Sequence, residues 1–134
     1  MVLLDTHVWL WWLHGDGLLS QKQRNALDTL AETKSIAVSW VSLWEMEMLE
    51  RKQRVQISIP LDEWFAKATH PSFCTVLPVD RELLLAQRLL PDTFHQDPAD
   101  RLISASAMLA DIPLATFDTR IRESCKGVIE FWDE

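Results

Sequence analysis

We predict an α/β fold with a mainly parallel central sheet, because short apolar segments alternate along the chain with longer segments of helical periodicity. The composition agrees with this prediction, since the hydrophobic fraction of 48% and the charged fraction of 25% are close to the averages of globular proteins. A length of 134 residues suffices for one hydrophobic core. The chain has no repeat, linker or low-complexity segment, so we expect a single domain that spans residues 1–134.

Strands are expected at the short apolar runs, and helices where apolar residues recur with helical spacing. In chain order, the expected elements are a strand at residues 1–4, helices at 6–13 and 21–32, a strand at 36–40, helices at 43–52 and 61–69, a strand at 75–79, helices at 81–90 and 98–110, a strand at 114–117 and a fifth strand at 128–132. The Gly15-Asp16-Gly17 turn is expected to end the first helix.

Capping signals support several of these helix starts. A capping residue has a side-chain oxygen that accepts a hydrogen bond from a free N–H in the first turn, and proline suits the first helical position. The sequence offers two capping-box patterns and two aspartate caps, namely Ser20 with Gln23, Ser42 with Glu45, Asp80, and Asp97 with Pro98.

The net charge and the cysteines narrow the class of protein. A formal net charge of −7 disfavours a protein that holds nucleic acid by bulk positive charge, but it is compatible with a carboxylate-lined metal site. Cys74 and Cys125 lack metal-type or redox-type spacing, which favours a reducing compartment. The first residues lack the features of a signal peptide, and the apolar run at 8–13 is too short for a membrane span. We therefore expect a cytoplasmic protein without membrane contact.

Four acidic residues follow strands or begin helices. Asp5 and Asp118 come directly after expected strands, and Glu45 and Asp100 fall in the first turns of expected helices. In a parallel α/β sheet the carboxyl ends of the strands and the amino ends of the following helices share one edge, where ligands bind. We therefore expect these four acids to converge in one cleft.

Clustered carboxylates repel one another unless a proton or a cation intervenes, and hard divalent cations prefer oxygen ligands. Such a cation lowers the pKa of a bound water and stabilises charge on a phosphate. The chemistry that this pattern favours is hydrolysis of a phosphodiester.

Each acid also has a purely structural interpretation. Glu45 is placed as the third residue of a capping box, Asp97 as an N-cap, and Asp100 as a favourable charge near a helix N-terminus. Asp5 is harder to explain in this way, because an acid at the end of a buried strand is costly to desolvate without a partner. From the residues alone, both interpretations stay open.

Four segments of the chain resemble the signature regions of PIN domains, and in particular those of the VapC-type toxins of bacterial toxin–antitoxin pairs. The segments lie in the family's order over essentially the whole chain: LDTHVWLW at 4–11, SWVSLWE at 39–45, DPADRLI at 97–103 and ATFD at 115–118. This resemblance implies a three-layer α/β/α PIN-like fold with a mainly parallel central sheet. It also implies an endoribonuclease that uses Mg²⁺ or Mn²⁺ and a metal-activated water to hydrolyse RNA.

The resemblance also assigns roles to individual residues. The acidic quartet of the family, which would be both catalytic and metal-binding, corresponds to Asp5, Glu45, Asp100 and Asp118. Thr116 matches a hydroxyl residue that orients a ligand or water. Asp97 matches an acid that contacts the metal ligands without binding the metal itself. The implied partners are an RNA substrate and a cognate antitoxin, in a homodimer or a toxin–antitoxin hetero-oligomer.

Several other side chains remain to be placed. Arg101 and Arg120 are candidates for contact with an RNA phosphate, whereas cations at 51–54 are explained by the dipole of the helix that they end. The tryptophans near the proposed strand ends suit core or dimer packing, RNA stacking or an antitoxin interface; they are Trp9, Trp11, Trp12, Trp40 and Trp44. The histidines lack zinc spacing and are expected to be structural or on the surface; they are His7, His14, His70 and His95.

Two alternatives of other classes compete with the nuclease. A receiver-like signalling domain also clusters acids to bind Mg²⁺, but it would carry adjacent acids before a strand-end phosphoacceptor and a lysine after the last strand, and neither occurs here. A catalytically silent PIN module would bind a partner without turnover, and the complete quartet disfavours it.

Overall fold

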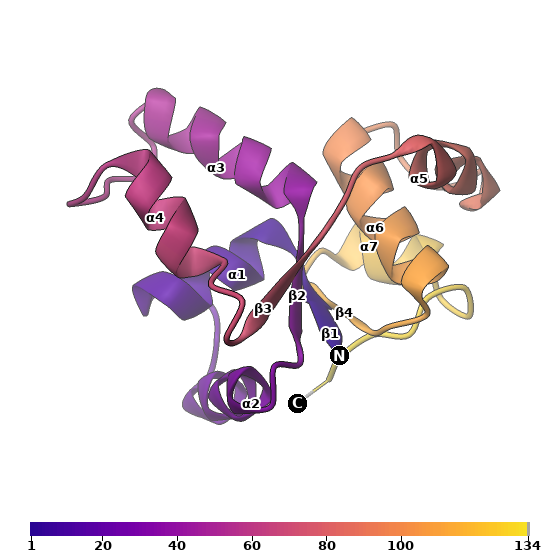
Figure 1. Cartoon of the computed structure of the whole chain (residues 1–134). Coiled ribbons are helices and arrows are strands. Elements are labelled where there is room, and N and C mark those ends of the chain that lie inside the picture. Colours follow the sequence, from indigo (N-terminus) through magenta and orange to yellow (C-terminus); the bar gives the residue numbers. More distant parts are fainter. Residues whose placement is uncertain (134) are drawn as a thin grey trace.

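The computed structural model describes residues 1–133 and contains a central parallel sheet (Figure 1). The strands are β1 (Val2–Leu4), β2 (Ile36–Ser39), β3 (Cys74–Leu77) and β4 (Leu114–Ala115). They pair in the order β3-β2-β1-β4, and every pairing is parallel. The prediction of a parallel α/β sheet is therefore confirmed, and β1 lies inside it with neighbours on both sides.

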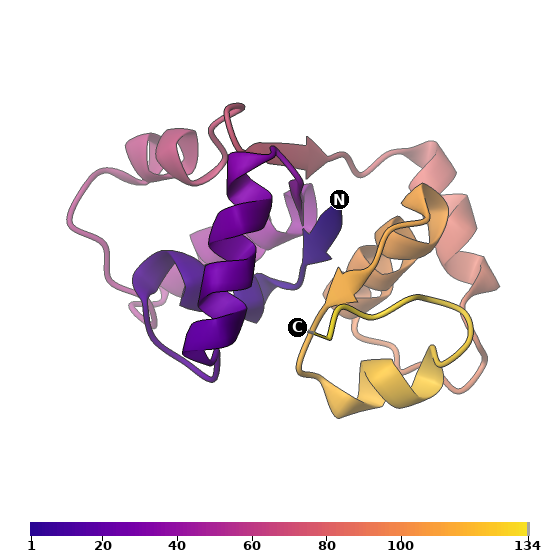
Figure 2. The same cartoon turned by 90° about the horizontal axis from the view of Figure 1, so that it is seen from below.

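Helices cover both faces of this sheet. They are α1 (Thr6–His14), α2 (Gln21–Glu32), α3 (Trp40–Arg51), α4 (Leu61–Ala68), α5 (Arg81–Ala86), the 3₁₀ helix η1 (Gln87–Leu89), α6 (Pro98–Ala110) and α7 (Thr119–Ser124). Figures 1 and 2 show α1, α2 and α4 in one group and α5, α6 and α7 in another. The expected three-layer α/β/α arrangement is confirmed.

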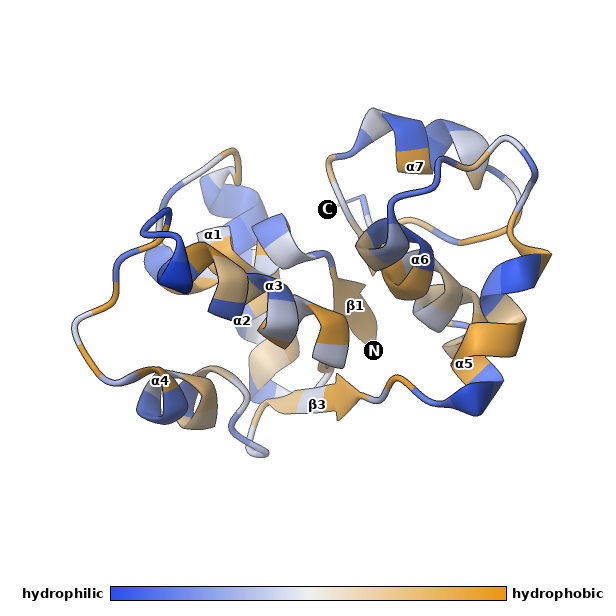
Figure 3. Ribbon diagram, turned by 90° about the horizontal axis from the view of Figure 1, so that it is seen from above, coloured by the Kyte–Doolittle hydropathy of each residue, from blue (hydrophilic) through white to orange (hydrophobic). Residues whose placement is uncertain are grey.

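The alternation of side chains along the strands explains the two layers. Val2 and Leu4 belong to a buried cluster with residues of α1, α2 and α4, whereas Leu3 belongs to a cluster with residues of α5, α6 and α7. Because both faces of the sheet are covered, the strands are mostly apolar and do not alternate with polar residues; the exceptions are Ser39 at the end of β2 and Thr75 in β3. Figure 3 shows β1 and β3 in hydrophobic colours between the helices.

The start of α3 differs from the prediction. The residue that caps it is Ser39, whose hydroxyl accepts a hydrogen bond from the Val41 N–H (3.0 Å), so β2 ends at Ser39 and the helix begins at Trp40. Ser42 therefore lies inside the helix, fully buried. The prediction that Ser42 and Glu45 form a capping box was wrong, because the helix starts one turn earlier.

Other element boundaries also differ from the predictions. Pro78 lacks the N–H that a strand ladder needs, so β3 ends at Leu77. The helix predicted at 81–90 is divided into α5 and η1, and it stops before Leu90, which is extended because it precedes Pro91. The predicted fifth strand is absent from the described residues, since residues 128–132 form only two isolated bridges, Phe131 with Leu114 and Ile129 with Lys126. β4 is two residues long and offers no room for a longer ladder.

No helix within residues 1–133 combines the length and the apolar character that would be needed to cross a bilayer.

Candidate active site

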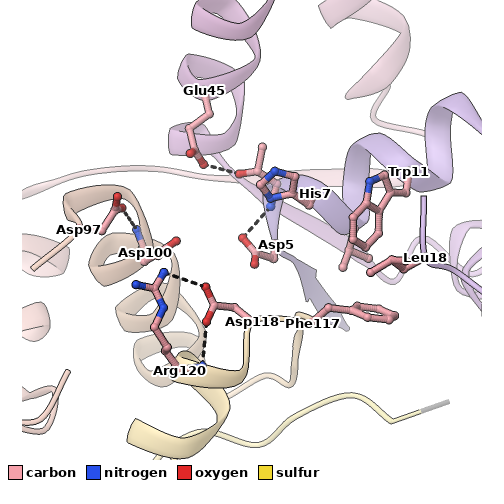
Figure 4. Close-up of a pocket in the computed structure, with 12 residues that line it drawn as sticks. Asp5, His7, Trp11, Leu18, Glu45, Asp97, Asp100, Phe117, Asp118 and Arg120 are labelled. Carbon is pink, nitrogen blue, oxygen red and sulfur yellow. Dashed lines mark hydrogen bonds and ion pairs between the residues drawn. The ribbon is translucent and has the colours of Figure 1, made fainter. Parts of the chain in front are cut away.

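A pocket of about 460 Å³ lies where α1, α3, α6 and the segment after β4 meet. Its acidic lining consists of the four predicted residues and one further aspartate: Asp5, Glu45, Asp97, Asp100 and Asp118. Figure 4 shows these side chains, with those of Glu45, Asp97 and Asp100 on the opposite side from Trp11, Leu18 and Phe117. The fold therefore brings together acids that are as many as 113 positions apart, from Asp5 to Asp118.

Asp5 occupies the centre of the site, at the end of β1, and is only 8% exposed. Its Oδ1 accepts a hydrogen bond from the Thr6 N–H (2.8 Å), and its Oδ2 accepts one from the Thr116 hydroxyl (2.7 Å). Burial raises the pKa of Asp5, although these two hydrogen bonds act in the opposite direction. The Asp100 carboxylate raises it further. An ionised Asp5 would therefore gain from a nearby cation.

Glu45 projects from the first half of α3 toward the same pocket. The Thr6 hydroxyl donates to Glu45 Oε1 (2.5 Å) and lies 2.8 Å from the Ser42 hydroxyl, so Ser42 is the donor in that second contact. Burial raises the pKa of Glu45, and the Asp5 and Asp100 carboxylates add to this effect. Thr6 thus links α1 to α3 directly at the site.

Asp100 stands in the first turn of α6, which the Asp97 side chain caps by accepting the Asp100 N–H (3.0 Å). The prediction that Asp97 is an N-cap is confirmed. The Asp100 carboxylate contacts His95 Nε2 at 2.7 Å, and the His95 ring stacks on Phe94 with centroids 4.7 Å apart. His95 Nδ1 is buried and has no partner among the described residues. Because a carboxylate oxygen only accepts, His95 Nε2–H is the donor in the contact with Asp100.

Asp118 begins α7, where its Oδ1 accepts the N–H groups of Arg120 (2.9 Å) and Ile121 (3.3 Å). Burial alone would raise the pKa of Asp118, but the hydrogen bonds from Ile121 and Arg120 outweigh it, and the pKa is lowered. Asp118 is thus ionised more readily than the buried acids. The Thr116 hydroxyl ties it to the centre of the site, since it accepts the Asp118 N–H (3.1 Å) while donating to Asp5.

The two predicted phosphate-contacting arginines have different positions. Arg120 lines the pocket, and its guanidinium is 3.5 Å from Asp118 Oδ2. Arg101 does not line it, because its guanidinium donates to the Gln87 side chain (2.8 Å) and carbonyl (3.0 Å) and lies over the Phe94 ring. The expectation for Arg101 is therefore corrected: this side chain fastens α6 to η1.

An aromatic shelf forms the other side of the pocket, and we define it as Trp11, Leu18 and Phe117. The Trp11 and Phe117 rings meet edge to face with centroids 5.5 Å apart. Trp11 lies against Gly17, whose φ is +81°, and a Cβ at Gly17 would come within 2.1 Å of the indole. Only glycine allows this packing, so the turn after α1 holds the shelf in place.

The remaining tryptophans divide between core and surface. Trp9 is fully buried and packs edge to face with Trp64, which confirms a core role. Trp12 is half-buried, and its indole N–H donates to Asp28 (2.9 Å). Trp40 and Trp44 are half-exposed on α3.

The donor set of the pocket fits a hard divalent cation, since it consists of carboxylate oxygens and the two most buried carboxyls have raised pKa values. As the side chains stand, no three His, Cys, Asp or Glu residues among those described are grouped closely enough to hold a metal ion. Each acid accepts at least one hydrogen bond from a protein donor, and each keeps a lone pair for a ligand on at least one of its carboxylate oxygens.

The fold and the site together define a class, an α/β/α domain with an acid-lined pocket at the carboxyl edge of a parallel sheet. Residues 2–127 match the PIN domain, and the chain belongs to this family. It is 35% identical over 122 residues to ribonuclease VapC22 of Mycobacterium tuberculosis, an alignment that covers 90% of this chain and 89% of that protein. This relationship makes the chain a homologue of the VapC ribonucleases.

Solved structures agree in fold. FitAcB from Neisseria gonorrhoeae matches with a TM-score of 0.70, over 98% of this chain and 97% of that one. A toxin–antitoxin complex from Klebsiella pneumoniae matches with a TM-score of 0.67 over the full length of both chains. A third, VapBC2 from Rickettsia felis bound to a promoter DNA fragment, has a TM-score of 0.66 over 98% of each chain. Each is 18% identical in sequence, so these matches describe the architecture.

A pH-dependent stability difference should distinguish Glu45 from an ordinary surface acid. Because burial raises the pKa of folded Glu45, the folded protein binds more protons than the unfolded chain between the two pKa values, and the contribution of Glu45 to stability falls as the pH rises. In metal-free buffer, wild-type protein should therefore gain stability relative to Glu45→Gln as the pH is lowered from 7 to 4. Thermal melts of both proteins measure this difference.

Glu47, on the same helix, is the matched control. Its hydrogen bond with Arg51 lowers its pKa, so its contribution is present above the unfolded pKa and is lost as the pH falls. The difference between wild type and Glu47→Gln should therefore have the opposite trend. If the stability difference changed with pH in the same direction for both variants, the raised pKa of Glu45 would be contradicted.

Proposed function

We propose that this chain is a divalent-metal-dependent endoribonuclease that acts as the toxin of a bacterial toxin–antitoxin pair. The observation that carries the proposal is the convergence of the acidic quartet in one pocket, on a chain homologous to a ribonuclease. Membership of the PIN family removes the receiver-like alternative. The complete set of acids favours an active enzyme over a catalytically silent PIN module.

Asp5, Glu45, Asp100 and Asp118 are the residues that would hold Mg²⁺ or Mn²⁺. A bound ion of this kind supplies a water of lowered pKa and stabilises charge on the phosphate. The second line of residues keeps the carboxylates oriented: Thr6 donates to Glu45, Thr116 donates to Asp5, and His95 donates to Asp100. These donors would hold in place the carboxylates that line the pocket.

Arg120 and the aromatic shelf are the residues that would position RNA. The Arg120 guanidinium is exposed, and its contact with Asp118 is long, so it is available to donate to a non-bridging phosphate oxygen. The shelf offers flat apolar surface on which a base next to the scissile phosphate would stack. RNA would therefore lie with its phosphate toward the acids and a base toward Trp11 and Phe117.

A protein antitoxin is the proposed inhibitor. The structural neighbours from Klebsiella and Rickettsia are described as a toxin–antitoxin complex and as VapBC2, which supports a comparable partner here. An apolar antitoxin segment suits the aromatic shelf, and a basic side chain suits the acids beside it. A homodimer, alone or within a hetero-oligomer, is the proposed assembly.

The direct test is cleavage of total cellular RNA by the purified chain with and without EDTA. We expect discrete RNA fragments in Mg²⁺ or Mn²⁺, no cleavage in excess EDTA, and recovery when excess Mn²⁺ is added back. Purified protein that leaves RNA intact under all metal conditions would instead favour the silent PIN module. Cleavage that persists in EDTA would point to a contaminating metal-independent ribonuclease or to a different mechanism.

A further inference from the structure

A second, smaller groove adjoins the acidic pocket. It has a volume of about 160 Å³ and shares three lining residues with the pocket, namely Thr6, His7 and Glu45. Its other lining residues are apolar or basic: Met48, Leu49, Lys52 and Arg54. The two cavities therefore adjoin at Thr6, His7 and Glu45, and the larger one has a mainly acidic lining whereas the charged residues that only the smaller one has are basic.

The C-terminal turn of α3 aims the cations into this groove. The Lys52 N–H donates to the Met48 carbonyl (3.0 Å), and the Arg54 N–H donates to the Leu49 carbonyl (2.8 Å). Gln53 between them has a φ of +60°, which reverses the chain. This left-handed conformation is disfavoured for a residue other than glycine. The reversal folds Arg54 back along the helix, next to the groove.

Neither cation is neutralised within the protein. No ion pair involves Lys52 or Arg54 among residues 1–133, although the chain carries a net charge of −7. Arg51 on the same turn is different, because its guanidinium pairs with Glu47 at 2.7 Å. The helix dipole explains a cation at the end of α3, but it does not explain why Arg54, beyond the helix end, faces a groove.

We propose that this groove binds the phosphates of single-stranded RNA that flank the scissile phosphodiester in the acidic pocket. The inference rests on the proposed function. A net-acidic protein with a carboxylate-lined site repels a polyanion, so it needs unpaired cations beside that site to hold the strand. Lys52 and Arg54 supply them, and the apolar side chains of Met48 and Leu49 offer a floor for the sugars.

The test measures the salt dependence of RNA binding, using a fluorescent single-stranded RNA oligonucleotide and anisotropy titrations. All proteins carry Asp5→Asn so that the probe stays intact. Replacing both cations, as Lys52→Gln with Arg54→Gln, removes two phosphate contacts, and the slope of log K against log salt should become shallower by about 1.4. Arg51→Gln removes a charge from the same turn outside the groove and should leave the slope unchanged.

Cleavage kinetics in the wild-type background separate this inference from the proposed function. EDTA-sensitive cleavage by the parent chain establishes the nuclease, and the double variant should then raise KM severalfold with little change in kcat. A nuclease whose double variant keeps the parental slope and KM would overturn the groove assignment alone. The groove assignment would also be overturned if the double variant bound RNA normally but bound the protein encoded by the neighbouring gene more weakly, because the groove would then hold a protein partner. A parent chain that neither cleaves nor binds RNA overturns both.

Discussion

Asp5→Asn is expected to reduce RNA cleavage by on the order of 100-fold or more, the usual effect of removing a group that stabilises charge in a transition state. The substitution removes a charge from the centre of the pocket while keeping the shape of the side chain. The amide oxygen still accepts the Thr6 N–H, and the amide nitrogen reaches the Thr116 hydroxyl. Initial rates on a defined RNA, at equal protein concentration, measure the loss.

The matched control is Asp28→Asn, which also lies at a hydrogen-bonded carboxylate but outside the pocket, where Asp28 accepts from the Trp12 indole. This variant should cleave at the wild-type rate. Full activity of Asp5→Asn would remove the central acid from the proposed mechanism. A loss of activity accompanied by a collapse of the circular dichroism spectrum would indicate unfolding rather than chemistry.

Mn²⁺ is expected to stabilise the folded chain strongly. A ligand that binds only the folded state adds about 2.7 kcal/mol to the free energy of unfolding when its free concentration is 100 times Kd. For a chain of this size, that raises Tm by on the order of 10 °C. The physical basis is the raised pKa of Asp5 and Glu45, because a cation relieves the cost of ionising both. Melting curves across a Mn²⁺ series measure the shift without any RNA.

The variant Asp5→Asn with Asp100→Asn should lose this response, whereas Glu47→Gln should keep it because Glu47 is a surface acid paired with Arg51. A double variant that gains as many degrees as the wild type would show that Mn²⁺ binds elsewhere. Calorimetric titration of the same three proteins gives the Kd on which the expected shift depends.

Much of the fold was predictable because its signals are local. β1 consists of apolar residues alone, and β2 is apolar until Ser39 at its end, as expected of buried parallel strands. Asp97 and Pro98 mark the start of α6 by the preferences of an N-cap and a first helical position. Asp5 directly follows β1, and Asp118 follows the end of β4 after two intervening residues, so the shared carboxyl edge of the sheet predicted that they would meet.

The features that were mispredicted depend on contacts between distant segments. Ser39 and Ser42 are equally good caps by sequence, and the burial of Ser42 against Thr6 of α1 decides between them. His95 was expected only to be structural or on the surface, and its contact with Asp100 could not be predicted because it lies in a loop with no periodicity. Arg101 lies next to a site acid in sequence, but on a helix its side chain points in another direction, toward Gln87.

The position of Lys52 and Arg54 beside a groove could not be read from the sequence. Their place at a helix end was sufficient to explain them as dipole partners. Gln53 has a positive φ, which turns the chain so that Arg54 lines the groove with Glu45. A positive φ is usually signalled by glycine or asparagine, and neither occurs at this position.

Three of the acids in the pocket also serve as helix N-caps. Asp5 accepts from the first residue of α1, Asp97 holds the start of α6, and Asp118 holds the start of α7. An N-cap aspartate is worth about 1 kcal/mol to the folded state, whether or not the protein cleaves anything. Natural selection for folding alone would thus retain these aspartates in a descendant that had lost its activity. Glu45 and Asp100 do not cap a helix. Their presence therefore says more than that of the three N-cap aspartates about whether a related protein is still an active enzyme.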